Sequence, residues 1–152
     1  MTPKSTGLST SRPATFVRAE PQLLAHNIGE SVEFYAEQLG FSVAFAYGEP
    51  PFYAQVYRGN AYLNLRHVDH PAFDPEWTRR EAILSATIAV DDAKSLFAEY
   101  EERAVDFEQP LRTEEWGAET FIVRDPDGNL ILFAGRAEAL ATPSSYESDA
   151  GK

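Results

Sequence analysis

The chain has 152 residues, no cysteine and a formal net charge of −11 at pH 7. Its length predicts a single domain that can bury a core without disulfides, and the missing cysteines exclude thiolate nucleophiles and thiolate zinc sites. Residues 20–136 carry 21 acidic and nine basic side chains, which argues against nucleic-acid binding because this surface would repel phosphates. The acidity serves either solubility or the attraction of a cationic ligand. No membrane helix or signal peptide is expected, so a cytoplasmic location is predicted.

The first half of the chain predicts one βαβββ unit. Residues 21–25 form a short apolar strand, and Asn27 can cap a helix that ends at Gly40. Three strands follow, because apolar and polar residues alternate with period two between strong turn signals. They are predicted at residues 41–46, 53–57 and 61–66.

The second half repeats this order after a polar linker. The linker, residues 68–82, contains Pro75, which suits the first position of a short helical turn. A strand at 83–90 precedes a helix whose start carries Asp91 and Asp92, where acidic charge suits the helix dipole. Further strands are predicted at residues 105–111, 119–124 and 130–134, with a turn at 125–129.

The two halves have a constant offset. Ser31 and Ser95 lie 64 residues apart, which maps Asn27 onto Asp91 and Phe41 onto Val105. We therefore expect an α+β fold of two tandem βαβββ modules. The predicted division is a flexible arm at 1–18, a single domain at 19–136 (module one 19–67, linker 68–82, module two 83–136) and a flexible tail at 137–152.

Aromatic residues are concentrated in the first module, where six lie within residues 45–62. One small core does not need so many aromatic rings. Some of them should therefore lie on the open face of the sheet, where they can stack on a planar or cationic ligand. Tyr47, Phe52 and Trp116 are the first candidates. Glu114 and Glu115 precede Trp116 in a loop that either meets a cation or simply faces solvent. The full set of ligand-binding candidates is Tyr47, Phe52, Tyr57, Tyr62, Asn64, Glu114, Glu115, Trp116 and Phe121.

Two phrases in the sequence carry a family resemblance. Phe34-Tyr35 precedes Leu39-Gly40-Phe41 in the first helix, and Arg124-Asp125-Pro126 precedes Gly128-Asn129 before the last strand. With the tandem modules, these phrases resemble the vicinal-oxygen-chelate superfamily, which holds glyoxalase I, extradiol dioxygenases and bleomycin-resistance proteins. The resemblance covers about residues 19–136.

The resemblance also implies where a metal would bind. Metal-using members place His, Gln or Glu ligands on four strands, and the corresponding positions here are Glu20, Asn64, Ser85 and Leu132. Only Glu20 is a good ligand, whereas a transition ion needs three. His26, His67 and His70 are interpreted as ordinary loop residues. We therefore expect no metal, no cofactor and no catalytic residue.

The metal-free branch of that superfamily contains the bleomycin-resistance proteins. Trp116-Gly117 ahead of Glu119 and Phe121 is similar to a run in that branch, and Pro21 stands where those proteins also carry a proline. The resemblance implies a homodimer with an exchanged N-terminal strand, in which the strands are cupped around a ligand cleft at the dimer interface. The predicted function is sequestration of a cationic or aromatic natural product, a bleomycin-like antibiotic above all, without contact with nucleic acid or membrane.

Three alternatives stay open at this point. The first keeps the fold and binding role but changes the ligand to another metabolite. The second is a metal-dependent enzyme of the glyoxalase or dioxygenase type that uses Glu20, and the third is a non-catalytic domain of a larger assembly.

Overall fold

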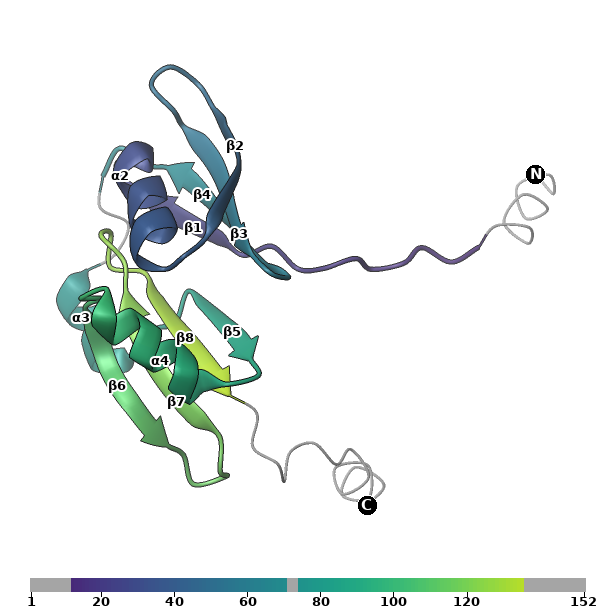
Figure 1. The fold of residues 1–152 in the computed structure, drawn as a ribbon. Helices are drawn as coiled ribbons and strands as arrows, with labels where there is room; N and C mark the ends of the chain where they lie inside the picture. The colour runs from purple at the N-terminus through teal and green to yellow at the C-terminus, as the bar shows by residue number, and fades with distance from the viewer. Residues whose placement is uncertain (1–11, 71–73, 136–152) are drawn as a thin grey trace.

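The computed structural model describes residues 12–70 and 74–135, which form two four-stranded sheets (Figure 1). In each sheet the first strand runs parallel to the last, and the other neighbours are antiparallel. The first sheet has the order β1-β4-β3-β2, with β1 (Gln22–Ala25), β2 (Ser42–Tyr47), β3 (Tyr53–Arg58) and β4 (Ala61–His67). The second has the order β5-β8-β7-β6, with β5 (Ala86–Val90), β6 (Phe107–Thr113), β7 (Glu119–Arg124) and β8 (Leu130–Gly135).

Two βαβββ modules are therefore present, and the expected α+β fold is confirmed. The sheets do not close into a barrel within the described ranges. The predicted tail at 137–152 and most of the predicted arm at 1–18 lie outside the described residues. Residues 12–20 are described, and they form an extended segment of exposed residues that runs from the start of β1 away from both modules in Figure 1.

Each helix begins at a side chain that caps it. Asn27 accepts a hydrogen bond from the backbone N–H of Glu30 at the start of α2 (Ile28–Glu33), which continues into the π-helical turn η1 (Phe34–Gln38). Asp74 and Asp92 cap α3 (Pro75–Glu81) and α4 (Ala93–Glu102) in the same way. No helix in the described part of the chain is long and apolar enough to cross a membrane.

The predicted offset of 64 residues between the modules does not hold at the start of the helices, because the first helix contains a π-helical turn. The cap of α4 is Asp92, whose carboxylate accepts from the N–H of Ser95 at 2.9 Å, so mapping Asn27 onto Asp91 is wrong by one residue. The chain reversals after the helices, at Gly40 and Ala104, nevertheless keep the offset of 64. The first helix therefore holds one extra residue. It is accommodated where the N–H of Leu39 bonds the carbonyl of Phe34, five residues back.

One apolar core runs through both modules. In β3 the alternation places Ala54 and Val56 in that core, whereas Tyr53 and Tyr57 on the other face are only partly buried. The second module contributes a cluster of aromatic rings, in which Phe121 lies between Phe97, Phe107, Phe133 and Tyr100 with centroid distances of 5.1–6.0 Å. Each sheet therefore turns one face toward the shared core and its helix.

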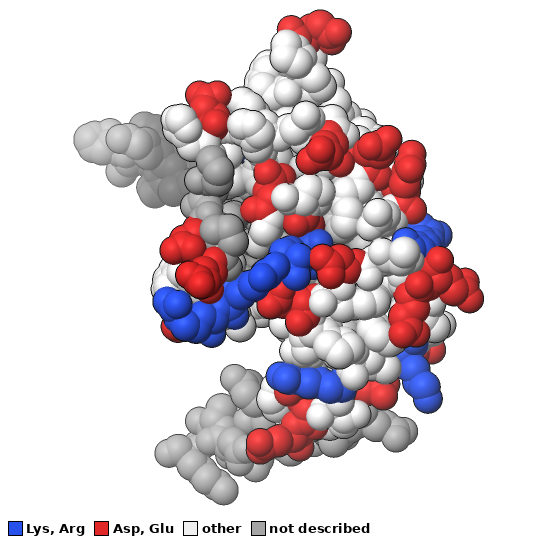
Figure 2. Space-filling model, turned by 90° about the vertical axis from the view of Figure 1, so that its left-hand side faces the viewer, with Lys and Arg blue, Asp and Glu red and all other residues white. Residues whose placement is uncertain are grey.

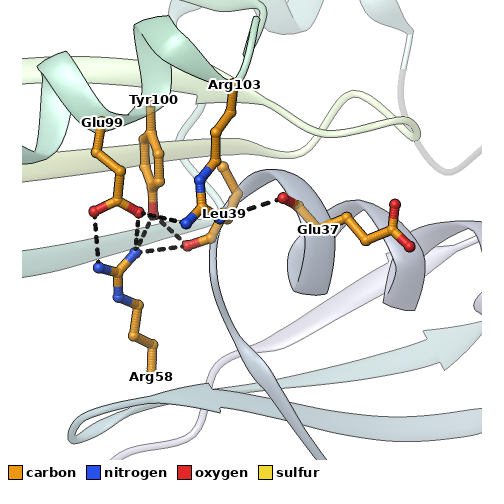
Figure 3. A network of polar contacts seen from close by, with 6 residues as sticks. All are labelled: Glu37, Leu39, Arg58, Glu99, Tyr100 and Arg103. Atoms are coloured by element: carbon orange, nitrogen blue, oxygen red, sulfur yellow. Dashed lines mark hydrogen bonds and ion pairs between the residues drawn. The ribbon is translucent and has the colours of Figure 1, made fainter.

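A polar network joins the modules beside this core (Figure 3). The hydroxyl of Tyr100 on α4 donates to the carbonyl of Leu39 at 2.7 Å, and this carbonyl also accepts from Arg58 at 2.9 Å. The Arg58 guanidinium forms a two-pronged ion pair with Glu99, at 3.0 Å for both hydrogen bonds. That contact lowers the pKa of Glu99, whereas burial raises the pKa of Tyr100 to about 12. The end of the first helix is thus held to the second module at several points.

A second network crosses the seam through a buried carboxylate. Asp125 is 4% exposed, and its oxygens accept from the Tyr35 hydroxyl at 2.8 Å and from the backbone and side chain of Asn129, each at 2.9 Å. The Asn129 amide also donates to the carbonyl of Leu24 at 3.0 Å, and Asp127 accepts from Ser31 at 3.1 Å. Burial raises the pKa of Asp125 to about 6, and these hydrogen bonds partly oppose the rise.

The buried carboxylate should make stability depend on pH. The folded pKa of Asp125 lies above its ordinary value of 3.8, so its contribution to stability is full below pH 3.8 and is lost as the pH rises through about 6. The shift corresponds to about 3 kcal/mol between these limits. We expect the free energy of unfolding of Asp125→Asn, measured by urea titration, to lack this component between pH 4 and pH 7.

The control is Asp91→Asn, which removes an exposed carboxylate from the same module. Because this variant keeps Asp125, its free energy of unfolding should keep the Asp125 component between pH 4 and pH 7. A constant difference between wild type and Asp125→Asn across this pH range would show that Asp125 has the same pKa in the folded and unfolded states.

Candidate functional site

The free face of the first sheet carries a ladder of aromatic rings. Strand pairing sets Tyr47 opposite Tyr53 and Tyr57 opposite Tyr62. The rings of Tyr57 and Tyr62 are stacked at 5.2 Å with an angle of 14°, and Phe45 lies 5.1 Å from Tyr47 and 6.0 Å from Tyr53. Aromatic rings arranged in this way form a surface on which a flat ligand can stack.

The tip of the β2–β3 hairpin extends this face beyond the rest of the module (Figure 1). Tyr47 and Phe52 flank the tip and are 57% and 58% exposed. The N–H of Phe52 donates to the carbonyl of Tyr47 at 2.8 Å, which closes the loop. Gly48 has a φ of 102°, and a Cβ there would lie 2.3 Å from the Phe52 ring, so only glycine allows this ring to fold back over the loop.

Polar side chains lie at the centre of the same face. The amide nitrogen of Gln55 donates to Glu20 at 3.0 Å and to Asn64 at 2.8 Å. The other oxygen of Glu20 accepts from Arg18 at 2.7 Å. The alternation of residues 53–57 places Gln55 on the tyrosine face, but the sequence does not show that Arg18 bends back to it.

The structure allows a test of the four implied metal positions. Glu20 and Asn64 lie close together, but the amide nitrogen of Gln55 stands between their oxygens, where a shared ion would need to be. Ser85 donates to Asn129 at 2.9 Å, and Leu132 has no donor atom. These residues do not fit a transition ion, because at most two oxygens face one point.

The histidines offer no better set. His26 and His67 have ring centroids 6.2 Å apart, and His67 lies 3.1 Å from Asp69. Across residues 12–70 and 74–135, no group of three or more His, Asp or Glu side chains converges as metal ligands do.

The second candidate region is the turn between β6 and β7. Trp116 is 58% exposed at its tip, and Glu115 beside it is exposed as well. Glu114 is held from within the module, because Thr120 donates to it at 2.6 Å and Arg112 at 2.9 Å. The Arg112 contact, followed by the Thr120 contact, lowers the pKa of Glu114, so the turn carries a firmly ionised carboxylate beside an exposed indole.

Phe121 does not belong to either exposed region. It is 0% exposed and lies among the aromatic rings of the second core. Its strand position follows the expected pattern, but the adjacent residues Thr120 and Ile122 are buried too. Alternation therefore does not predict which face is free, and Phe121 cannot contact a ligand in this chain.

The two exposed aromatic regions lie at opposite ends of the folded molecule. In Figure 1 the β2–β3 tip with Tyr47 and Phe52 is at the top, and the β6–β7 turn with Trp116 is at the bottom. The modules place these hairpins in equivalent positions, so each module carries one exposed aromatic tip. A single chain does not bring the two together at one ligand.

A groove of about 640 Å³ lies between the modules. The residues just before β1, the β3–β4 turn, β5 and the first turns of α4 line it, including Asp91, Asp92 and Glu99 opposite Arg58. Figure 2 shows acidic side chains spread over both modules, while basic ones form a few groups. Both observations favour a cationic over an anionic ligand.

Known structures resemble this fold closely. A bleomycin-binding protein from bleomycin-producing Streptomyces verticillus, complexed with copper(II)-bleomycin, is 28% identical, with a TM-score of 0.64 over 82% of this chain and 99% of that one. A glyoxalase/bleomycin resistance protein/dioxygenase from Alicyclobacillus acidocaldarius is 21% identical, with a TM-score of 0.64 over 80% and 92% of the two chains. TioX from Micromonospora sp. ML1 is 19% identical, with a TM-score of 0.64 over 79% and 98%. The last two show the fold alone.

No curated protein sequence matches the chain. A family model, in contrast, matches residues 18–133 and covers both modules. With the tandem βαβββ order, this match shows that the chain belongs to the Glyoxalase/Bleomycin resistance protein/Dioxygenase superfamily.

Proposed function

We propose that the protein is a metal-free cytoplasmic binding protein that sequesters a cationic or aromatic natural product of the bleomycin type. The observation that carries this proposal is the aromatic ladder on the free face of the first sheet, with Tyr47 and Phe52 exposed beside a polar centre. The relative complexed with copper(II)-bleomycin supports it. The acidic surface suits a cation.

Binding rather than catalysis is proposed because the four implied metal positions do not fit an ion. The superfamily's metal chemistry would need electrophilic activation of oxygen atoms, and the Gln55 amide occupies the point between the two oxygens that face each other. The geometry therefore does not favour the enzymatic alternative.

The complete site is proposed to form between two copies of the chain. Tyr47 and Phe52 lie far from Trp116 within one chain, whereas a two-fold dimer can place the first module of one copy against the second module of the other. The exposed segment supports this arrangement, because Phe16 is 97% and Val17 81% exposed. Apolar side chains exposed to this extent indicate a partner surface.

The partner surface for this segment is proposed to be the groove between the modules. There, β5 is an edge strand with β8 as its only neighbour among the described strands, so the groove side of its backbone can accept an added strand. Pro21 suits the exchange because it keeps the chain extended where the exposed segment meets the start of β1.

The binding proposal predicts the outcome of a fluorescence titration. Bleomycin, metal-free and copper-loaded, should quench the tryptophan emission saturably at one drug per chain, with a sub-micromolar dissociation constant, or more than about 8 kcal/mol. Trp116→Ala should weaken binding at least tenfold in calorimetry, because it removes an exposed stacking surface. Trp77→Phe is the matched control, and it should leave the constant unchanged. No response at tens of micromolar drug would retire bleomycin as the ligand.

The dimer proposal predicts an effect of the exposed segment on association. The double variant Phe16→Ser, Val17→Ser should weaken the dimer by about four orders of magnitude in sedimentation analysis, because each of the two exchanged segments loses two buried apolar side chains worth about 3 kcal/mol together. Ala14→Ser on the same segment should change nothing. Equal dimerisation of the double variant and the wild type would show that the segment does not dock on a partner.

A further inference from the structure

Arg18 folds back from the exposed segment onto the aromatic ladder. Its guanidinium carbon lies 3.5 Å from the centre of the Tyr62 ring, and Tyr62 is itself stacked on Tyr57. The Nε of Arg18 donates to Glu20 at 2.7 Å. A planar cation thus lies on an aromatic face and meets a carboxylate at its edge, the two contacts that a guanidinium makes best.

The two side chains that contact Arg18, Glu20 and Tyr62, also have contacts with the sheet that do not involve Arg18. The second oxygen of Glu20 accepts from Gln55, which also donates to Asn64. Gln55 and Asn64 are buried, at 7% and 9% exposed. The Tyr57–Tyr62 pair is fixed by the register of β3 and β4. Tyr62 and Glu20, backed by Gln55 and Asn64, are called the cation box below.

Arg18 itself is anchored more weakly than the box. Both Arg18 and Glu20 belong to the exposed segment, but Glu20 is tied to the sheet by the buried Gln55. The Arg18 side chain, 36% exposed, has its ion pair with Glu20 and its contact with the Tyr62 ring. Exposed ion pairs and exposed cation–π contacts are each worth little. Another planar cation can therefore replace Arg18 without disturbing the sheet.

We propose that the cation box binds the guanidinium or amidinium group of the protein's ligand, and that Arg18 occupies this place until the ligand displaces it. The inference rests on the proposed binding function and deepens it, because it names the cationic group that the ligand must carry. The box selects a planar, delocalised cation over an ammonium, since only a planar group can stack on Tyr62 and meet Glu20 edge-on.

The experiment uses the full chain and two small probes of nearly identical shape. Benzamidinium carries the planar cation, and benzamide is its neutral analogue. Binding is followed by nuclear magnetic resonance, with the Arg18 Nε–H signal as a direct measure of displacement. Benzamidinium should release this N–H from its hydrogen bond to Glu20, and benzamide should not.

Variants separate competition from a general effect of charge. Arg18→Ala should tighten benzamidinium binding about threefold to tenfold, because the competitor is removed. Glu20→Gln should weaken it by at least as much, and neither variant should alter benzamide binding. Arg12→Ala is the matched control, because it removes an arginine from the same segment outside the box, and it should leave both probes unaffected.

The contrary outcomes are clear. If Arg18→Ala leaves benzamidinium binding unchanged or weakens it, or if Arg12→Ala has the same effect as Arg18→Ala, the inference is overturned. Failure of the bleomycin titration together with the expected benzamidinium results would retire bleomycin and keep the cation box. Tight bleomycin binding with benzamidinium indifferent to both Arg18 and Glu20 would keep the function and overturn the box.

Discussion

A four-stranded sheet with a single helix packed on it can bury only one of its faces, and the protein depends on this constraint. The buried faces of both sheets contribute to one continuous core, and no other described element covers the tyrosine face of the first sheet. On this face Gln55 and Asn64 place hydrogen-bonded polar groups among the large rings. The face proposed to bind a ligand is therefore a consequence of how the core is built.

The order of the strands could be predicted from the sequence because it depends on local signals. Apolar runs, period-two alternation and turn residues mark all eight strands within a few residues, and the turn at residues 125–129 is evident from its composition. The one-residue error between Asn27 and Asp91 arose because a π-helical turn leaves no mark in the apolar spacing. The turn takes up one extra residue between the helix cap at Asn27 and the chain reversal at Gly40.

The candidate site was harder to predict because it depends on which face of each sheet is covered. Tyr47, Phe52 and Trp116 are the first candidates for ligand contact from the sequence, and all three are exposed. Phe121 has the same residue type and strand pattern but lies in the core. The position of Arg18 over Tyr62 depends on a bend in a segment without periodicity, and no spacing rule encodes such a bend.

Two polar networks join the modules, and the charged group that crosses is a cation in one and a carboxylate in the other. The two halves of the duplicated fold are therefore not interchangeable. The turn after β3 offers a cation, Arg58, to a carboxylate on α4, whereas the turn after β7 offers a carboxylate, Asp125, to a hydroxyl on the first helix. Two first modules brought together would set Arg58 against a helix without Glu99 and leave Tyr35 without its acceptor. A newly made chain, or two chains that exchange parts, can therefore distinguish a second module from another copy of the first by charge alone.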